Sequence, residues 1–175
     1  MRPWLQHLNN REASICRTWS RSGQRVWVHR PFALVSRLGD GVFWYCLMAI
    51  LPLLYGVEGL KASLHMLVTG GVALALYKSL KGVTRRERPC HHASDIMALV
   101  PPLDRYSFPS GHTLHAVSFS AVAVYYFPQL GWLLIPFTAL VASSRILLGL
   151  HYPSDVLMAT LFGLTLAYSS LSMLD

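Results

Sequence analysis

The sequence SRILLGLHYPSD, residues 144–155, joins two strongly apolar segments and places polar side chains where the chain re-enters its core. His151 and Asp155 are four residues apart, one helical turn, so both can share a helix face. A carboxylate there can hold one imidazole nitrogen and leave the other free as a nucleophile. Arg145 offers a planar donor fork suited to phosphate oxygens. The same residues also fit a capped helix with a buried Arg–Asp pair, so this stretch alone leaves both interpretations open.

The flanking segments belong to a series of apolar blocks that contain no Asp, Glu, Lys or Arg. Charged residues make up only 13% of the 175 residues, and the mean hydropathy is +0.40. The blocks are Gly41–Val57, Ala62–Tyr77, Tyr106–Ser144 and Val156–Leu174. A membrane span needs about 20 mainly apolar residues, and the third block is long enough for two. The sequence therefore predicts an all-α, integral-membrane bundle of about five transmembrane helices, with a hairpin over residues 56–61.

Residues 1–40 are rich in arginine and tryptophan and are too charged to span a membrane. The arginines are Arg2, Arg11, Arg17, Arg21, Arg25, Arg30 and Arg37. This pattern predicts an amphipathic interfacial lead over residues 1–40, followed by a membrane domain over residues 41–175. The net charge of +7 fits anionic lipid headgroups or a phosphate substrate. Because membrane burial already explains the fold, we expect no nucleic-acid partner.

The predicted topology brings three polar segments to one side of the membrane: the N-terminal region, residues 78–110 and residues 145–155. Of the 15 Lys and Arg residues, only Lys61 falls on the opposite side. Polar stretches that are distant in sequence therefore meet on one face, where they can assemble a site.

Two of these segments carry residues suited to binding an anion. Lys81 and Arg88 are seven residues apart, two helical turns, so both can point at one anion if the helix extends that far. Ser110, Gly111 and His112 precede an apolar helix, whose first turn offers unpaired N–H groups and a cap position. Interpreted singly, the cations fit interfacial anchors, and the second stretch fits a helix cap with an exposed histidine.

The three stretches together form a specific pattern. Lys-x6-Arg-Pro (Lys81–Pro89), Pro-Ser-Gly-His (Pro109–His112) and Ser-Arg-x5-His-x3-Asp (Ser144–Asp155) resemble the three-part signature of the type 2 phosphatidic acid phosphatase superfamily. The order of the motifs and their placement at span ends match as well. The resemblance extends from about residue 38 to the C-terminus and implies a membrane lipid phosphatase.

The resemblance implies a role for each matching residue. His151 would attack phosphorus and form a phosphohistidine, with Asp155 orienting its ring. His112 would protonate the leaving lipid oxygen and then activate water. The groups implied to bind the phosphoryl oxygens are Lys81, Arg88, Ser110, Gly111 and Arg145. We expect no metal or other cofactor, because cations and amides can supply the charge stabilisation that phosphoryl transfer needs.

The implied substrate is a lipid phosphate or diphosphate: phosphatidic acid, phosphatidylglycerol phosphate, a polyprenyl diphosphate or a lipid A phosphate. The motifs contact phosphate and not the lipid tail, so the sequence does not choose among them. A lipid phosphotransferase with the same intermediate is one alternative, and a non-catalytic helix bundle such as a transporter is another. Uninterrupted apolar blocks argue against the soluble vanadium haloperoxidases of the same superfamily.

We expect a multi-pass protein of the bacterial inner membrane. Arginines ahead of the first span favour a cytoplasmic N-terminus and a site on that side, whereas many bacterial members of the resembled superfamily work on the outer face. Arg85, Arg86 and Arg105 are expected to face lipid headgroups. Asp40 is expected to form a turn, and Asp104 to serve loop solvation.

Overall fold

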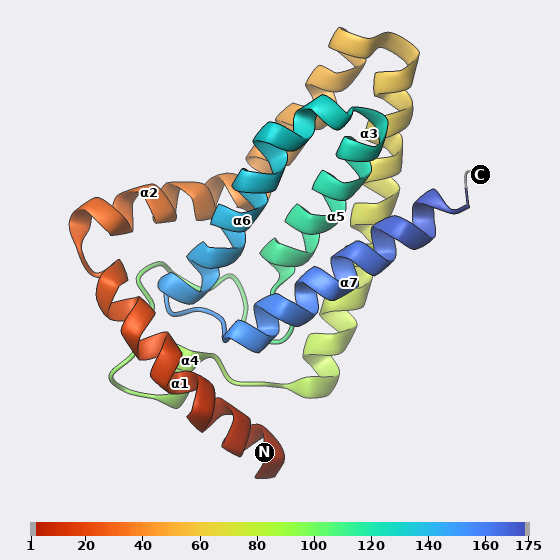
Figure 1. The fold of residues 1–175 in the computed structure, drawn as a ribbon. Coiled ribbons are helices and arrows are strands. Elements are labelled where there is room, and N and C mark those ends of the chain that lie inside the picture. Colours follow the sequence, from red (N-terminus) through yellow and green to blue (C-terminus); the bar gives the residue numbers. More distant parts are fainter. Residues whose placement is uncertain (1–2, 174–175) are drawn as a thin grey trace.

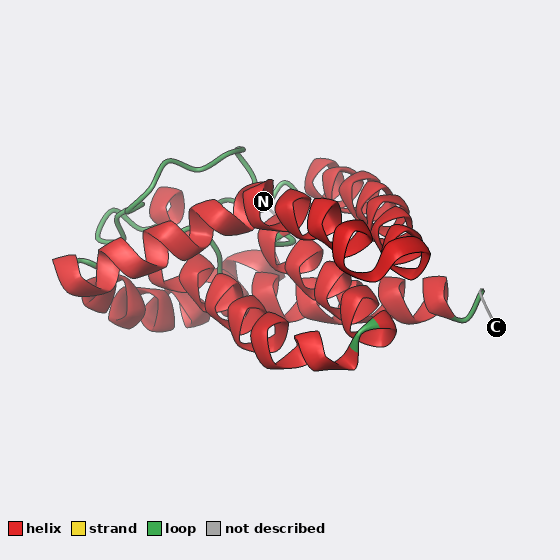
Figure 2. Cartoon of the chain, turned by 90° about the horizontal axis from the view of Figure 1, so that it is seen from above, coloured by secondary structure: helices red, strands yellow, loops and turns green. Residues whose placement is uncertain are grey.

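The computed structural model describes residues 3–173 and is built from helices. In chain order they are α1 (Pro3–Gly23), α2 (Val26–Arg37), η1 (Leu38–Val42), α3 (Phe43–Thr84), α4 (Pro89–His92), α5 (Gly111–Tyr126), η2 (Pro128–Leu130), α6 (Gly131–Leu147) and α7 (Pro153–Leu171). Between residues 3 and 173 the only β pairing is an isolated antiparallel bridge from Glu87 to Tyr106. Figure 2 shows the helices seen from above. The predicted all-α bundle is confirmed.

The long helix α3 folds back on itself and forms a helical hairpin. Gly56 breaks the helical conformation with φ 57° and ψ −129°, a left-handed φ that glycine adopts without steric cost. Close packing follows at Gly59, where an added Cβ would lie 2.0 Å from the carbonyl oxygen of Leu51. The first two predicted spans are thus the two arms of α3, which turn at one end of the molecule (Figure 1).

Within residues 3–173, three segments are long and apolar enough to cross a membrane on their own: Val26–Thr84, Pro128–Leu147 and Pro153–Leu171. The first of them contains both arms of α3. The remaining predicted span, α5, has 16 residues, of which nine are buried. At about 1.5 Å per residue it is shorter than a bilayer core, and it occupies the middle of the bundle with α3, α6 and α7 around it (Figure 1).

Small residues allow the helices to approach α5 closely. A Cβ added to Gly70 in α3 would lie 2.6 Å from the ring of Phe119, and one added to Gly163 in α7 would lie 2.9 Å from Val117. Such contacts are typical of membrane helix packing, where dispersion replaces the hydrophobic driving force. Large apolar side chains point outward instead, among them Leu53, Trp132 and Tyr168, as expected for surfaces that face lipid.

The polar segments gather at one end of the bundle. Figure 1 places α1, α4 and the loops over residues 93–110 and 148–152 there, and the Gly56 turn and η2 at the opposite end. Helix α1 packs into this end, burying Ala13 and Cys16 in a cluster with Ile96 and Tyr152. The division at residue 40 stays a prediction.

Candidate active site

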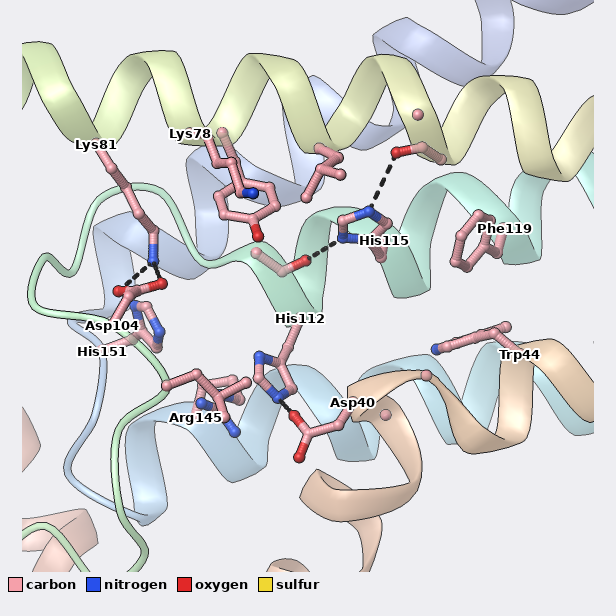
Figure 3. Close-up of a pocket in the computed structure, with 18 of the residues that line it drawn as sticks. Asp40, Trp44, Lys78, Lys81, Asp104, His112, His115, Phe119, Arg145 and His151 are labelled. Atoms are coloured by element: carbon pink, nitrogen blue, oxygen red, sulfur yellow. Dashed lines mark hydrogen bonds and ion pairs between the residues drawn. The ribbon is translucent and has the colours of Figure 1, made fainter.

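The predicted site residues gather around one cavity of about 710 Å³ at the polar end of the bundle. Its lining includes Lys81, Arg88, Gly111, His112, Arg145 and His151. Figure 3 shows side chains from α3, α5 and α6 converging there with His151 from the loop before α7. The other two predicted residues, Ser110 and Asp155, are fully buried behind the lining. The fold thus brings the three sequence stretches together.

His151 and Asp155 lie around the start of α7 rather than on one face of it. Pro153 opens this helix, and Asp155 caps it by accepting a hydrogen bond at Oδ2 from the backbone N–H of Tyr152, 2.9 Å away. The predicted shared helix face is therefore wrong, because the capping turn sets the spacing. The two side chains are nonetheless close: Asp155 Oδ2 lies 3.5 Å from His151 Nδ1, although Nδ1 makes no hydrogen bond within the described part of the chain.

The other ring nitrogen of His151 faces the cations of the cavity. Arg88 Nη1 lies 3.1 Å from His151 Nε2, and because a guanidinium only donates, Nε2 is the acceptor. Burial, reinforced by the positive charges of Arg88 and Arg145, lowers the pKa of His151 well below its ordinary value of 6.5. The imidazole is therefore neutral at pH 7, with its lone pair toward the cavity.

Lys81 and Arg88 converge on the carboxylate of Asp104. Lys81 Nζ lies 2.6 Å from Oδ2, and Arg88 Nη2 lies 2.8 Å from Oδ1. Helix α3 ends at Thr84, and Arg85 turns left-handed at φ 47°. The helix therefore does not extend as far as Arg88, the condition for the predicted two-turn alignment, and Arg88 reaches the cavity from the loop beyond it. Burial favours the neutral form of Asp104, but hydrogen bonds and charge from Lys81, with the charge of Arg88, hold its pKa below the ordinary 3.8.

Arg145 stands in the last turn of α6 with its side chain inside the protein. Only 2% of the residue is exposed. Its Nη1 donates to Ser36 Oγ in α2, whereas its Nε is buried without a hydrogen-bond partner in the described part of the chain. A buried guanidinium with an unused donor is costly and suits an anion that enters the cavity.

The start of α5 forms another wall of the cavity. Ser110 caps this helix, with its Oγ accepting a hydrogen bond from the Thr113 N–H over 3.4 Å. Gly111 lines the cavity, but a Cβ added there would lie 3.5 Å from the ring of Tyr77, which is an ordinary contact. The first-turn N–H groups remain suited to an anion.

His112 stands in the first turn of α5 and has a carboxylate partner of its own. Its Nε2 pairs with Oδ1 of Asp40 in η1 (Figure 3). Gly41, at φ 139°, allows the chain to bend between α2 and α3, and this bend carries Asp40 to the cavity. Each of the two histidines thus faces an aspartate, Asp155 for His151 and Asp40 for His112.

Sequence reasoning missed three polar residues of this site. Asp40 was expected to form a turn and Asp104 to serve loop solvation. The expectation that Arg86 faces lipid headgroups is wrong, since its side chain is 2% exposed and contacts Asp155 at 2.7 Å. The small number of acidic residues could have indicated the two aspartates. Only eight residues are Asp or Glu, so each one near a basic motif was a candidate ion-pair partner. Nothing local distinguishes Arg86 from its exposed neighbour Arg85.

Comparison with models of protein families identifies the family to which this site belongs. The model of the PAP2 superfamily matches residues 62–175. The chain belongs to the PAP2 superfamily. The superfamily resemblance expected from the motifs is therefore confirmed, and the match includes the eight predicted site residues.

Two PAP2 relatives and one solved structure illustrate the similarity. The decaprenylphosphoryl-5-phosphoribose phosphatase of Mycobacterium tuberculosis is 36% identical over 151 residues, covering 81% of each chain. The undecaprenyl-diphosphatase BcrC of Bacillus subtilis is 33% identical over 114 residues, 65% of this chain and 58% of the relative. The transmembrane PAP2-type phosphatidylglycerolphosphate phosphatase of B. subtilis superimposes with a TM-score of 0.73 at 26% identity, covering 91% of this chain and 84% of that one. The chain thus spans less than two thirds of BcrC, and its fold is that of a membrane PAP2 protein.

Proposed function

We propose that this PAP2 protein hydrolyses a lipid phosphate or diphosphate, without a metal, through a phosphohistidine at His151. The observation that carries the proposal is the state of His151: one ring nitrogen faces Asp155, and the other faces the cavity beside Arg88. A neutral imidazole oriented in this way is a nucleophile, and the surrounding cations can stabilise charge on the transferred phosphoryl group.

The proposed reaction proceeds in two balanced steps. In the first, His151 Nε2 attacks phosphorus, the bond from phosphorus to the lipid oxygen breaks, and His112 gives its proton to that oxygen. In the second, His112 takes a proton from water, the resulting hydroxide displaces His151, and inorganic phosphate leaves. Arg88 must shift its donor from Nε2 to a phosphoryl oxygen as the substrate enters. Asp155 stabilises the proton at Nδ1 throughout.

Phosphoryl oxygens would be held by groups from three elements. Lys81 and Arg88 would exchange the Asp104 carboxylate for phosphate, and Arg145 would use its unpaired Nε. The N–H groups at Gly111 would complete the cradle. Ser110 is already engaged as the cap of α5, so we propose that it holds these amides in place; direct bonding to phosphate by Ser110 stays a prediction.

The shape of the cavity supports a lipid substrate. Beyond the polar residues the cavity continues along an apolar wall that includes Trp44, Met48, Leu67, Leu74 and Phe119. Leu67 and Leu74 are also exposed on the outer surface of the bundle, so a substrate tail can lie against them from the membrane. The names of the relatives state lipid-linked phosphate substrates, undecaprenyl diphosphate and decaprenylphosphoryl-5-phosphoribose. Phosphate-release assays with several lipid phosphates would distinguish among these substrates.

We further propose a bacterial inner-membrane location with the site on the cytoplasmic side. Helix α1, which carries Arg11, Arg17 and Arg21, lies at the polar end of the bundle (Figure 1), and basic residues are enriched on the cytoplasmic side. Exposed Val26 and Trp27 on α2 support an interfacial position for this N-terminal lead. Labelling of a cysteine added at Gln24 by a membrane-impermeant reagent in intact cells would overturn this orientation, and labelling only after lysis would support it.

The proposal is tested by phosphate release from purified protein in detergent with EDTA. The substrates are phosphatidic acid, phosphatidylglycerol phosphate, a polyprenyl diphosphate and a lipid A phosphate. We expect release by the wild type and by the control variant His92→Ala, and none by His151→Ala. Release only after an acceptor alcohol is added would indicate a phosphotransferase. Equal activity of His151→Ala and wild type would contradict the mechanism, and no release by any form would favour a non-catalytic bundle.

A further inference from the structure

Arg86 is buried at the centre of a polar network that joins helix α1 to the predicted dyad of His151 and Asp155. Every nitrogen of its guanidinium has a partner. Nη1 lies 2.7 Å from Asp155 Oδ1, Nη2 lies 2.7 Å from Glu12 Oε2, and Nε lies 2.9 Å from Asn9 Oδ1. An arginine held on all three sides has a fixed orientation, because its donor fork is planar and rigid.

The two carboxylate oxygens of Asp155 contact different groups. Oδ1 accepts from Arg86, whereas Oδ2 accepts from the Tyr152 N–H at 2.9 Å and faces His151 Nδ1 at 3.5 Å. Rotation of this carboxylate would break its contact with Arg86. Arg86 therefore helps to fix the plane of the carboxylate, and with it the direction of the oxygen that faces the histidine ring. Its guanidinium also lies over the ring of Tyr152, 4.1 Å from the centroid, which restricts the turn that carries His151.

Glu12 completes the charge balance of this network. Its carboxylate accepts from Arg86 and also from the N–H and hydroxyl of Ser154, at 2.9 and 2.7 Å. Ser154 and Asp155 form the first turn of α7, so α1 is bonded to the start of this helix at two successive residues through Glu12 and Arg86. With Glu12 present, the single positive charge of Arg86 is shared between two carboxylates, and Asp155 keeps negative charge for the proton on His151.

We propose that Arg86 and Glu12 are positioning residues for the His151–Asp155 dyad, which makes helix α1 part of the catalytic apparatus. The inference rests on the proposed role of His151 as nucleophile. Glu12 lies outside residues 62–175, the part matched by the PAP2 model. In this chain the dyad is thus completed by a segment beyond the family match.

Loss of either residue has a definite consequence for the dyad. Without Arg86, Asp155 is a fully buried carboxylate without its cation, a state that favours the protonated acid. A protonated Asp155 loses the charge that stabilises the proton on His151 Nδ1. Without Glu12, the positive charge of Arg86 is paired with Asp155 alone and neutralises more of the negative charge of this carboxylate. Neither residue lines the cavity, so both changes should act on kcat and leave KM nearly unchanged.

The test measures phosphate release by the full chain in detergent for Arg86→Gln, Glu12→Gln, Asp155→Asn and the double variant Arg86→Gln/Asp155→Asn. We expect Arg86→Gln to lower kcat by roughly 10–100-fold, by analogy with the loss of residues that orient metal ligands. Glu12→Gln should lower it by a smaller factor. In the Asp155→Asn background, Arg86→Gln should cost little more, because the interaction it supports is already gone.

Arg17→Gln is the matched control. Arg17 also joins α1 to the site end of the bundle, through a 2.6 Å pair with Asp95, but this pair is half exposed and touches no dyad residue. Its loss should change kcat by less than about twofold. An equal loss in Arg17→Gln and Glu12→Gln, or a full loss from Arg86→Gln in the Asp155→Asn background, would reduce α1 to a structural role and overturn the inference.

A readout independent of turnover separates this inference from the proposed function. In histidine-labelled protein, the proton on His151 Nδ1, 3.5 Å from Asp155 Oδ2, should give an NMR resonance protected from exchange with solvent in the wild type and in Arg17→Gln. This resonance should be lost in Arg86→Gln, measured at a temperature at which a thermal unfolding curve shows the variant to be folded. If Arg86→Gln does not fold, the same measurement is made on Glu12→Gln. A resonance unchanged in Glu12→Gln and Arg86→Gln would overturn the inference, whereas absence of phosphate release by the wild type would overturn only the proposed function.

Discussion

Replacement of Asp40 by asparagine should slow hydrolysis of lipid phosphates and spare substrates that have a good leaving group. Asp40 contacts Nε2 of His112, the residue proposed to protonate the leaving oxygen. The neutral amide keeps the shape of the side chain and removes the charge that stabilises a protonated imidazole.

The size of the effect follows from the contact and its exposure. Two unit charges about 4 Å apart interact by about 4 kcal/mol at an effective dielectric constant of about 20. The Asp40 side chain is 34% exposed, so solvent screening reduces this to about 1–2 kcal/mol. Since each 1.36 kcal/mol is tenfold in rate, we expect Asp40→Asn to lower kcat by roughly 5–30-fold for an alkyl lipid phosphate.

The assay compares initial rates on that lipid phosphate and on an aryl phosphate whose phenolate leaves without protonation. We expect the aryl substrate to lose less than about twofold, because general acid help contributes little when the leaving group is already stable. Asp95→Asn removes a carboxylate from an exposed pair on the same end of the molecule and should leave both rates unchanged. Equal losses on the two substrates in Asp40→Asn would show that Asp40 acts on folding or binding, and would contradict a role in protonating the leaving oxygen.

The remaining predictions concern other groups of the site and the bundle. Arg145→Lys removes the donor fork, and because a hydrogen bond to a charged group contributes about 1.5–3 kcal/mol, kcat/KM should fall roughly 10–100-fold; unchanged steady-state kinetics would exclude this side chain from phosphate binding. The lowered pKa of His151 means that its lone pair is lost only when the pH falls well below 6.5, so the acid limb of kcat/KM against pH should lie below this value, and a limb at or above 6.5 would contradict a neutral nucleophile. Gly163→Leu forces a side chain against Val117 and should lower stability in detergent by about 1–3 kcal/mol, whereas Gly71→Ala, with nothing within 4 Å of the added carbon, should not destabilise the protein in the same thermal unfolding assay.

Much of the fold could be predicted because membrane helices are encoded locally. Uncharged apolar blocks marked the spans, and the break over residues 56–61 marked the fold-back of α3. The cap position at Ser110 marked the start of α5 at Gly111. One feature required tertiary information. The N-terminal region was expected on the side of the site, but the bonds that Glu12 of α1 makes to Arg86 and Ser154 depend on how the helices pack.

The candidate site likewise contains residues that could be predicted from local sequence and residues that could not. Basic and histidine residues stood in motifs with fixed spacing, so Lys81, Arg88, His112 and His151 could be predicted as a group. Asp155 stands in the same motif as His151 and could be predicted with it. The acidic partners of the other residues could not, because they come from separate parts of the chain: Asp40 lies 72 residues from His112. Glu12 and Arg86 are 74 residues apart. Such pairs depend on how elements pack, and no periodicity within either segment reports them.

The central claim is that His151 carries the phosphoryl group during turnover. The most direct test uses His112→Ala with the aryl phosphate. The phenolate of this substrate leaves without protonation, so His151 can still be phosphorylated, but hydrolysis of the phosphohistidine lacks its general base. A phosphorylated protein should accumulate to about one phosphoryl group per chain, and mass spectrometry should locate it on His151. The double variant His112→Ala/His151→Ala should stay unmodified. Turnover of the aryl phosphate by wild-type protein with no phosphoryl group on His151 in the His112→Ala variant, or with the group on another residue, would contradict the account.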